Sequence, residues 1–134
     1  MIMNLFEECI EVLGESARVL DKTETAVVFK KFENSVPITW YGRIDWENLN
    51  DFEEIQNSKE ILNHIRAEDK CFVLWNDMSL PVLETTVASF LENIDYVLAV
   101  SFDKWLVVNS KNVIIEFFHD RLIKLVKTNY GLLR

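Results

Sequence analysis

Ten consecutive residues, from Asp45 to Glu54, carry five carboxylates, two aromatic side chains and no basic side chain. Two carboxylates can perform acid–base catalysis when they face each other across a cleft with separated pKa values. Acids in a run give no such geometry, and a charged run is most often a solvated surface. The missing Lys or Arg and the aromatic side chains favour another interpretation, a surface that binds a basic partner. The expected contacts in this acidic segment are Asp45, Glu47, Asp51, Glu53 and Glu54, with Trp46 and Phe52 as apolar anchors.

A second candidate surface combines the turn at Asn76 and Asp77 with Asp95 and Asp103, which lie near the ends of expected strands. The sequence does not decide which of the two surfaces faces a partner. Core packing is the alternative for Trp46, because large aromatic side chains are usually buried. Core packing is also the expectation for the remaining tryptophans, Trp40, Trp75 and Trp105.

The two cysteines, Cys9 and Cys71, are expected to be buried structural thiols. Cys9 lies on the apolar stripe of a predicted helix, and Cys71 begins an apolar run. A nucleophilic thiolate needs an electropositive and partly exposed setting, which this acidic chain does not offer. Neither cysteine has a second Cys or His at the spacing of a metal site, so no metal or other cofactor is predicted.

The two histidines also lack the partners that catalysis requires. His64 is expected on a helix and His119 in a turn, and a general base needs an orienting group and a pocket. One alternative stays open, a small-ligand binding domain or minor enzyme whose pocket lies near His119, Asp120 and Glu116.

Composition narrows the classes of function. The chain has 134 residues, 49% hydrophobic and 27% charged, as expected for one globular domain spanning residues 1–134. Its net charge of −8 lies almost entirely in the first 70 residues, which hold fifteen acidic and eight basic side chains. This charge repels nucleic acid and favours a basic protein partner. No basic leader or long apolar run is apparent, so we expect a cytoplasmic protein without membrane contact.

Apolar periodicity predicts the elements that must position these residues. A helix is expected at 5–13, capped by Asn4. The acidic segment is expected as a loop or the start of a helix. The other elements expected in the first half are a strand at 17–20, a helix that begins at Thr23 or Thr25 and ends before Asn34, an extended segment at 38–46, and a helix that begins at Asn57 or Ser58 and closes near Ala67.

The second half is richer in strands. Residues 71–75 form a continuous apolar run, as expected for a buried strand. A helix is expected to begin at Thr85 or Thr86. Further strands are expected at 81–83, 96–101, 105–108, 113–118 and 122–127. The predicted fold is therefore α+β: a mostly antiparallel sheet from the C-terminal half, with helices from the N-terminal half packed on it.

Several packing and turn motifs together resemble the immunity proteins of bacterial contact-dependent growth inhibition systems. They are Asn-Leu-Phe-Glu-Glu-Cys at 4–9, Tyr-Gly-Arg-Ile-Asp-Trp at 41–46, Phe-Val-Leu-Trp-Asn-Asp at 72–77, Leu-Pro-Val-Leu at 80–83, Ile-Asp-Tyr-Val at 94–97, Ala-Val-Ser at 99–101 and Val-Ile-Ile-Glu-Phe-Phe-His at 113–119. The resemblance implies a non-enzymatic cytoplasmic protein that neutralises the C-terminal toxin domain of a large surface effector. Many such toxins are nucleases with basic active sites. The resemblance transfers no site residue, since the toxin-contacting positions vary within the family.

A different binding mode is also compatible with immunity. If residues 122–127 form an edge strand, they can pair with a strand of a partner or with a second copy of the chain in a homodimer. This mode places the site away from the acidic segment.

Overall fold

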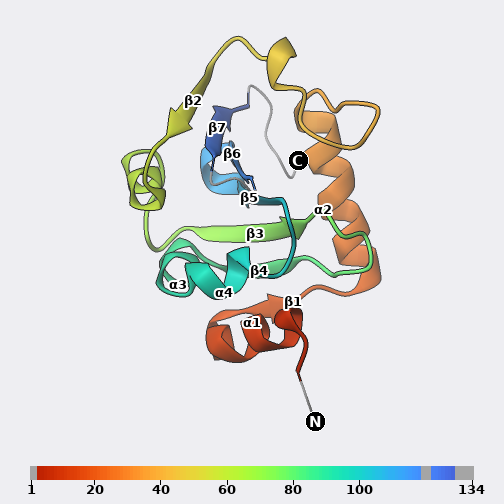
Figure 1. The fold of residues 1–134 in the computed structure, drawn as a ribbon, viewed down its shortest axis with the longest axis vertical. Coiled ribbons are helices and arrows are strands. Elements are labelled where there is room, and N and C mark those ends of the chain that lie inside the picture. Colours follow the sequence, from red (N-terminus) through yellow and green to blue (C-terminus); the bar gives the residue numbers. More distant parts are fainter. Residues whose placement is uncertain (1–2, 119–121, 129–134) are drawn as a thin grey trace.

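The computed structural model describes residues 3–118 and 122–128, and within them it contains one seven-stranded antiparallel sheet with the order β1-β4-β3-β5-β6-β7-β2 (Figure 1). The strands are β1 (Arg18–Val19), β2 (Phe52–Ile55), β3 (Lys70–Trp75), β4 (Leu83–Thr86), β5 (Lys104–Val108), β6 (Val113–Phe117) and β7 (Ile123–Lys127). The α-helices are α1 (Leu5–Leu13), α2 (Lys22–Ser35), α3 (Val87–Glu92) and α4 (Ile94–Leu98). Short 3-10 helices occur at η1 (Gly14–Ser16), η2 (Trp46–Asn48), η3 (Ser58–Asn63) and η4 (Asn109–Lys111). The α+β prediction is confirmed.

The sheet is covered by helices on both faces. Alternate residues along the central strands point to opposite faces, so Leu106 and Ile115 pack with α1, α3 and α4, while Trp105 and Ile114 pack with α2. Figure 1 shows α2 on one side of the sheet, away from the other three helices. Burial on both faces explains why β3, β5 and β6 consist of nearly continuous apolar runs.

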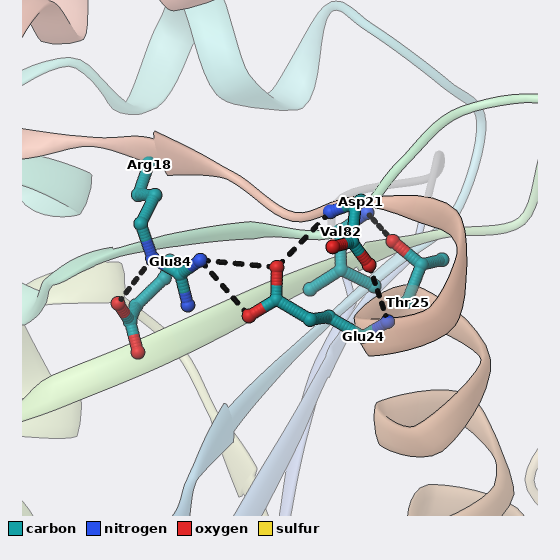
Figure 2. Close-up of polar contacts among 6 residues, drawn as sticks. All are labelled: Arg18, Asp21, Glu24, Thr25, Val82 and Glu84. Atoms are coloured by element: carbon teal, nitrogen blue, oxygen red, sulfur yellow. Dashed lines mark hydrogen bonds and ion pairs between the residues drawn. The ribbon is translucent and has the colours of Figure 1, made fainter.

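The start of α2 is fixed by polar contacts with the sheet (Figure 2). Asp21 is the cap, in place of the predicted Thr23 or Thr25, because its side chain accepts the Glu24 N–H at 2.8 Å while the Glu24 carboxylate accepts the Asp21 N–H. Thr25 instead accepts the Val82 N–H, at 3.2 Å. Arg18 forms one ion pair with Glu24 of α2, at 2.9 Å, and another with Glu84 of β4, at 3.3 Å, and so links the helix to the sheet. The helix also runs through Ser35, further than predicted.

Two predicted elements of the second half differ in the structure. The predicted strand at 96–101 is instead the end of α4 and the turn after it, because Ile94, Val97 and Leu98 repeat at helical spacing toward the core. The predicted strand at 81–83 begins only at Leu83 and continues to Thr86.

The edges of the sheet also differ from the prediction. The strand predicted as a free edge, β7, pairs with β6 on one side and with β2 on the other. The edge is β2, which forms the end of the acidic segment and was expected as a loop or helix start. Its register places Phe52 opposite Val126 and Ile55 opposite Ile123, so apolar pairing with β7 supports a strand despite the two glutamates between them.

The helix predicted after β2 is a 3-10 helix. Asn57 caps it as expected, but η3 ends at Asn63, short of the predicted end near Ala67. The first predicted helix, α1, has the expected boundaries, and Asn4 and Glu7 form a capping box at its start.

Candidate functional site: an acidic edge of the sheet

Three carboxylates of the acidic segment are exposed to solvent. Among the described residues, Glu47, Asp51 and Glu54 form no ion pair. The other two acids have partners: Glu53 lies 2.9 Å from Nε2 of His64, and half-buried Asp45 accepts a hydrogen bond from the side chain of Asn48. The first three are therefore the acids most available to a partner. We call them the acidic edge.

The two predicted anchors differ in exposure. Trp46 is buried, with only 8% of its surface exposed, and its ring lies 5.1 Å from that of half-buried Phe52. Trp46 is thus a core residue that supports Phe52, in line with the packing alternative. Lys124 of β7 lies over both rings, at 5.7 and 5.3 Å, and faces Glu54 across the strand pair. The basic group missing from the segment itself is supplied from a distant part of the chain.

A depression of about 710 Å³ lies beside the acidic edge. Its wall is formed by residues 48–53 and by residues 125–127 of β7, with His64 at one side. The depression gives a partner's side chains access to Asp51 and Glu53 together. The structure therefore brings most of the acidic segment to one end of the molecule, at the top of Figure 1.

The loop before the acidic segment exposes two aromatic side chains. Trp40 is 94% exposed and Tyr41 60% exposed, which corrects the expectation that Trp40 packs in the core. The expected extended segment at 38–46 is in fact a tight reversal, with one bridge between Ile38 and Ile44. Gly42 permits this reversal because its φ is +86°. We call Trp40 and Tyr41 the aromatic tip.

A buried ion pair anchors this loop to the sheet. Nη2 of Arg43 lies 2.9 Å from Oε1 of Glu116, which is completely buried, and Nη1 lies 3.6 Å from Asp103. The second carboxylate oxygen of Glu116 accepts the indole N–H of Trp105 at 2.7 Å. Asp103 is therefore buried and paired, and it does not form the exposed surface predicted around Asp77.

The rest of the second candidate surface lines an open groove of about 1160 Å³. Asp77 and Asp95 are exposed there, next to exposed Met78 and Phe102. The hydroxyl and backbone N–H of Ser79 donate to Asp77 and lower its pKa. The groove begins directly after β2, since Gln56 and Ser58 line it, so the two candidate surfaces adjoin.

A family comparison identifies the class of protein. The family model described as "CdiI immunity protein EcoliA0-like" matches residues 3–126. The chain belongs to this family of immunity proteins. The resemblance to contact-dependent growth inhibition immunity proteins is thereby confirmed, and the family implies the neutralisation of a toxin by a non-enzymatic inhibitor. No curated protein matches the chain.

The match covers all the helices that the structure describes, both acidic surfaces and the aromatic tip. Of the residues in the alternative pocket, Glu116 is buried and bound to Arg43, whereas His119 and Asp120 lie outside the described residues. Within residues 3–118 and 122–128, no three His, Cys, Asp or Glu side chains are grouped to hold a metal ion. The same residues include no helix with the length and apolarity needed to cross a membrane.

Both thiols of the immunity protein are buried, as predicted. Burial raises the pKa of Cys9 to about 11 and that of Cys71 to about 12. At neutral pH both groups are therefore protonated, and neither has the thiolate character of a catalytic cysteine.

The raised pKa values predict a loss of stability at alkaline pH. The folded state keeps both protons to a higher pH than the unfolded state, in which a thiol has its ordinary pKa of 9.0. Thiol ionisation therefore leaves stability unchanged well below pH 9. The free energy of unfolding should fall as the pH rises from 9, until about 11 for the contribution of Cys9 and about 12 for that of Cys71. Denaturant titrations of the wild type and of Cys9→Ala/Cys71→Ala across this range measure the effect. A curve that is equally steep in both proteins would contradict the assignment to the thiols.

Proposed function

We propose that this immunity protein binds the toxin domain of a contact-dependent growth inhibition effector in the cytoplasm and neutralises it by covering a basic surface. The observation that carries the proposal is the acidic edge, where Glu47, Asp51 and Glu54 are exposed and form no ion pair among the described residues. A nuclease must bind phosphates with basic side chains, so a nuclease is the proposed class of toxin.

Electrostatics explains why unpaired acids favour such a partner. A net charge of −8 attracts a basic protein at long range and increases the rate of encounter at low salt. At contact, a toxin Lys or Arg can pair with Asp51 or Glu54 without first breaking an internal ion pair. Phe52, half-buried beside Glu54, supplies apolar area next to the charges.

The test is the affinity for the C-terminal toxin domain encoded immediately upstream of this gene, measured for charge variants at low and high salt. The triple variant Glu47→Gln/Asp51→Asn/Glu54→Gln should bind about 10- to 100-fold more weakly at low salt, since each exposed acid contributes up to about 1 kcal/mol. Its affinity should also depend less on salt than that of the wild type.

A matched control removes the same charge from α1 and the adjoining η1, at the opposite end of the molecule (Figure 1). Glu8 and Glu11 of α1 and Glu15 of η1 are exposed there, so Glu8→Gln/Glu11→Gln/Glu15→Gln changes the net charge equally without touching the acidic edge. The control should bind nearly as tightly as the wild type. Equal losses in the two triple variants would show that only net charge matters. A further variant, Asp77→Asn, tests the second surface, and a loss confined to this variant would move the site to the groove.

A further inference from the structure

We infer that the aromatic tip, Trp40 with Tyr41, is the apolar anchor that inserts into a Lys- or Arg-lined hollow of the toxin domain. The inference rests on the proposed function and specifies which residues provide its main apolar contact. The sequence pattern suggested Trp46 as an apolar anchor, but Trp46 is buried, and the aromatic tip is the exposed alternative.

Such high exposure is unusual for large aromatic side chains. The indole of Trp40 is 94% exposed, while the other three tryptophans of the chain are buried. Tyr41 lies against it edge-on, with ring centroids 5.2 Å apart, so the two rings form one projecting apolar patch. Tryptophan and tyrosine are the residues most enriched among interface hot spots.

The backbone of the tip is held by hydrogen bonds and by its neighbours before any partner binds. The Thr39 N–H donates to the Arg43 carbonyl at 2.7 Å, and the Arg43 N–H donates back to the Thr39 hydroxyl at 3.0 Å. Ile44 is buried below the turn, and Arg43 binds the buried carboxylate of Glu116. A backbone fixed in this way loses little conformational freedom on binding, which favours affinity.

The position of the tip indicates which side chains of the toxin domain can surround it. Its base continues directly into the acidic segment, since the Asp45 N–H donates to the Pro37 carbonyl at 2.8 Å. Glu47 follows two residues after Asp45. A partner that encloses the tip therefore also contacts carboxylates at the base of the tip. Lys and Arg suit both features, because their cations pair with carboxylates and stack on indole and phenol faces.

The first test is the affinity of Trp40→Ala for the toxin domain encoded directly upstream. Removal of a hot-spot tryptophan should weaken binding at least about 30-fold. Because Trp40 contributes almost nothing to the core, the variant should unfold at the wild-type denaturant concentration. The matched control is Phe102→Ala, another exposed aromatic that lies on the groove. It should bind within about threefold of the wild type, a change typical of residues outside hot spots.

The second test observes the indole directly. Protein labelled with 5-fluorotryptophan gives one ¹⁹F resonance for each of its four tryptophans, and Trp40→Phe assigns that of Trp40. Unlabelled toxin domain should shift the Trp40 resonance and protect it from solvent, with smaller changes at the buried tryptophans.

The outcomes separate the two proposals. Wild-type binding with an unchanged Trp40 resonance, or with full affinity of Trp40→Ala, would overturn the aromatic anchor and leave the proposed function standing. A loss in Phe102→Ala alone would place the anchor in the groove and also overturn it. No binding of the wild type at low salt would overturn both.

Discussion

Replacing Arg43 with methionine is expected to lower the free energy of unfolding by about 3 kcal/mol. The variant removes the cation next to Glu116, whose side chain is completely buried. Removing one member of a buried ion pair typically costs 3–5 kcal/mol because the remaining charge is left without compensation. The lower figure applies here, since the Arg43 side chain itself is partly exposed. Denaturant unfolding followed by circular dichroism gives the value.

Two controls identify the cause of this loss. The double variant Arg43→Met/Glu116→Gln removes the charge of Glu116, the closer of the two buried carboxylates beside Arg43, while the new amide oxygen still accepts the Trp105 indole N–H. It should therefore recover part of the stability. Arg18→Met deletes an exposed arginine that also forms two ion pairs, and its effect should be much smaller. A double variant as unstable as Arg43→Met would show that the uncompensated charge of Glu116 is not the cause of the loss.

Replacing Phe90 with alanine is expected to lower the free energy of unfolding by about 3–5 kcal/mol. Phe90 joins α3 to the sheet: its ring is buried and lies 5.3 Å from that of Phe117 in β6. The deletion removes aromatic contacts and leaves a cavity that the surrounding helices and strands can fill only in part. A domain with a typical total stability of 5–15 kcal/mol would lose a large share of it.

The same chemical change at an exposed position provides the comparison. Phe102→Ala removes a ring that is 76% exposed, and it should cost less than about 1 kcal/mol. Similar losses of stability for the two variants would contradict the burial of Phe90 between α3 and the sheet. Unfolding midpoints measured under one set of conditions decide between these results.

Local signals predicted much of the fold. Asn4 and Glu7 define the start of α1 by a capping box that can be recognised in the sequence. The apolar runs of β3, β5, β6 and β7 likewise predicted strands of a mostly antiparallel sheet. These elements depend mainly on neighbouring residues, so their positions follow from periodicity.

Two elements depend on contacts far along the chain and were predicted wrongly. The acid-rich β2 is a strand because Phe52 and Ile55 pair with Val126 and Ile123 of β7, more than 60 residues away in sequence. Residues 94–98 are apolar enough for a strand or a helix, and packing on α1 selects the helix α4.

The candidate site shows the same limit. Exposure of Glu47, Asp51 and Glu54 agrees with the prediction from composition, but the exposures of Trp40 and Trp46 are the reverse of the expected ones. The reversal of the chain at Gly42 directs Trp40 to solvent, while Trp46 packs below Lys124. The available signal was Gly42 itself, because glycine in an extended segment often marks a bulge or a close approach of the backbone, but sequence alone gives no direction for the turn.

The most direct test of the central claim is hydrogen–deuterium exchange of this protein, free and bound to the toxin domain encoded upstream. Protection on binding is expected to be concentrated in residues 36–57, which include the aromatic tip, the acidic edge and β2. Protection confined to the groove around Asp77 and Phe102, or to the opposite edge at β1, would contradict it.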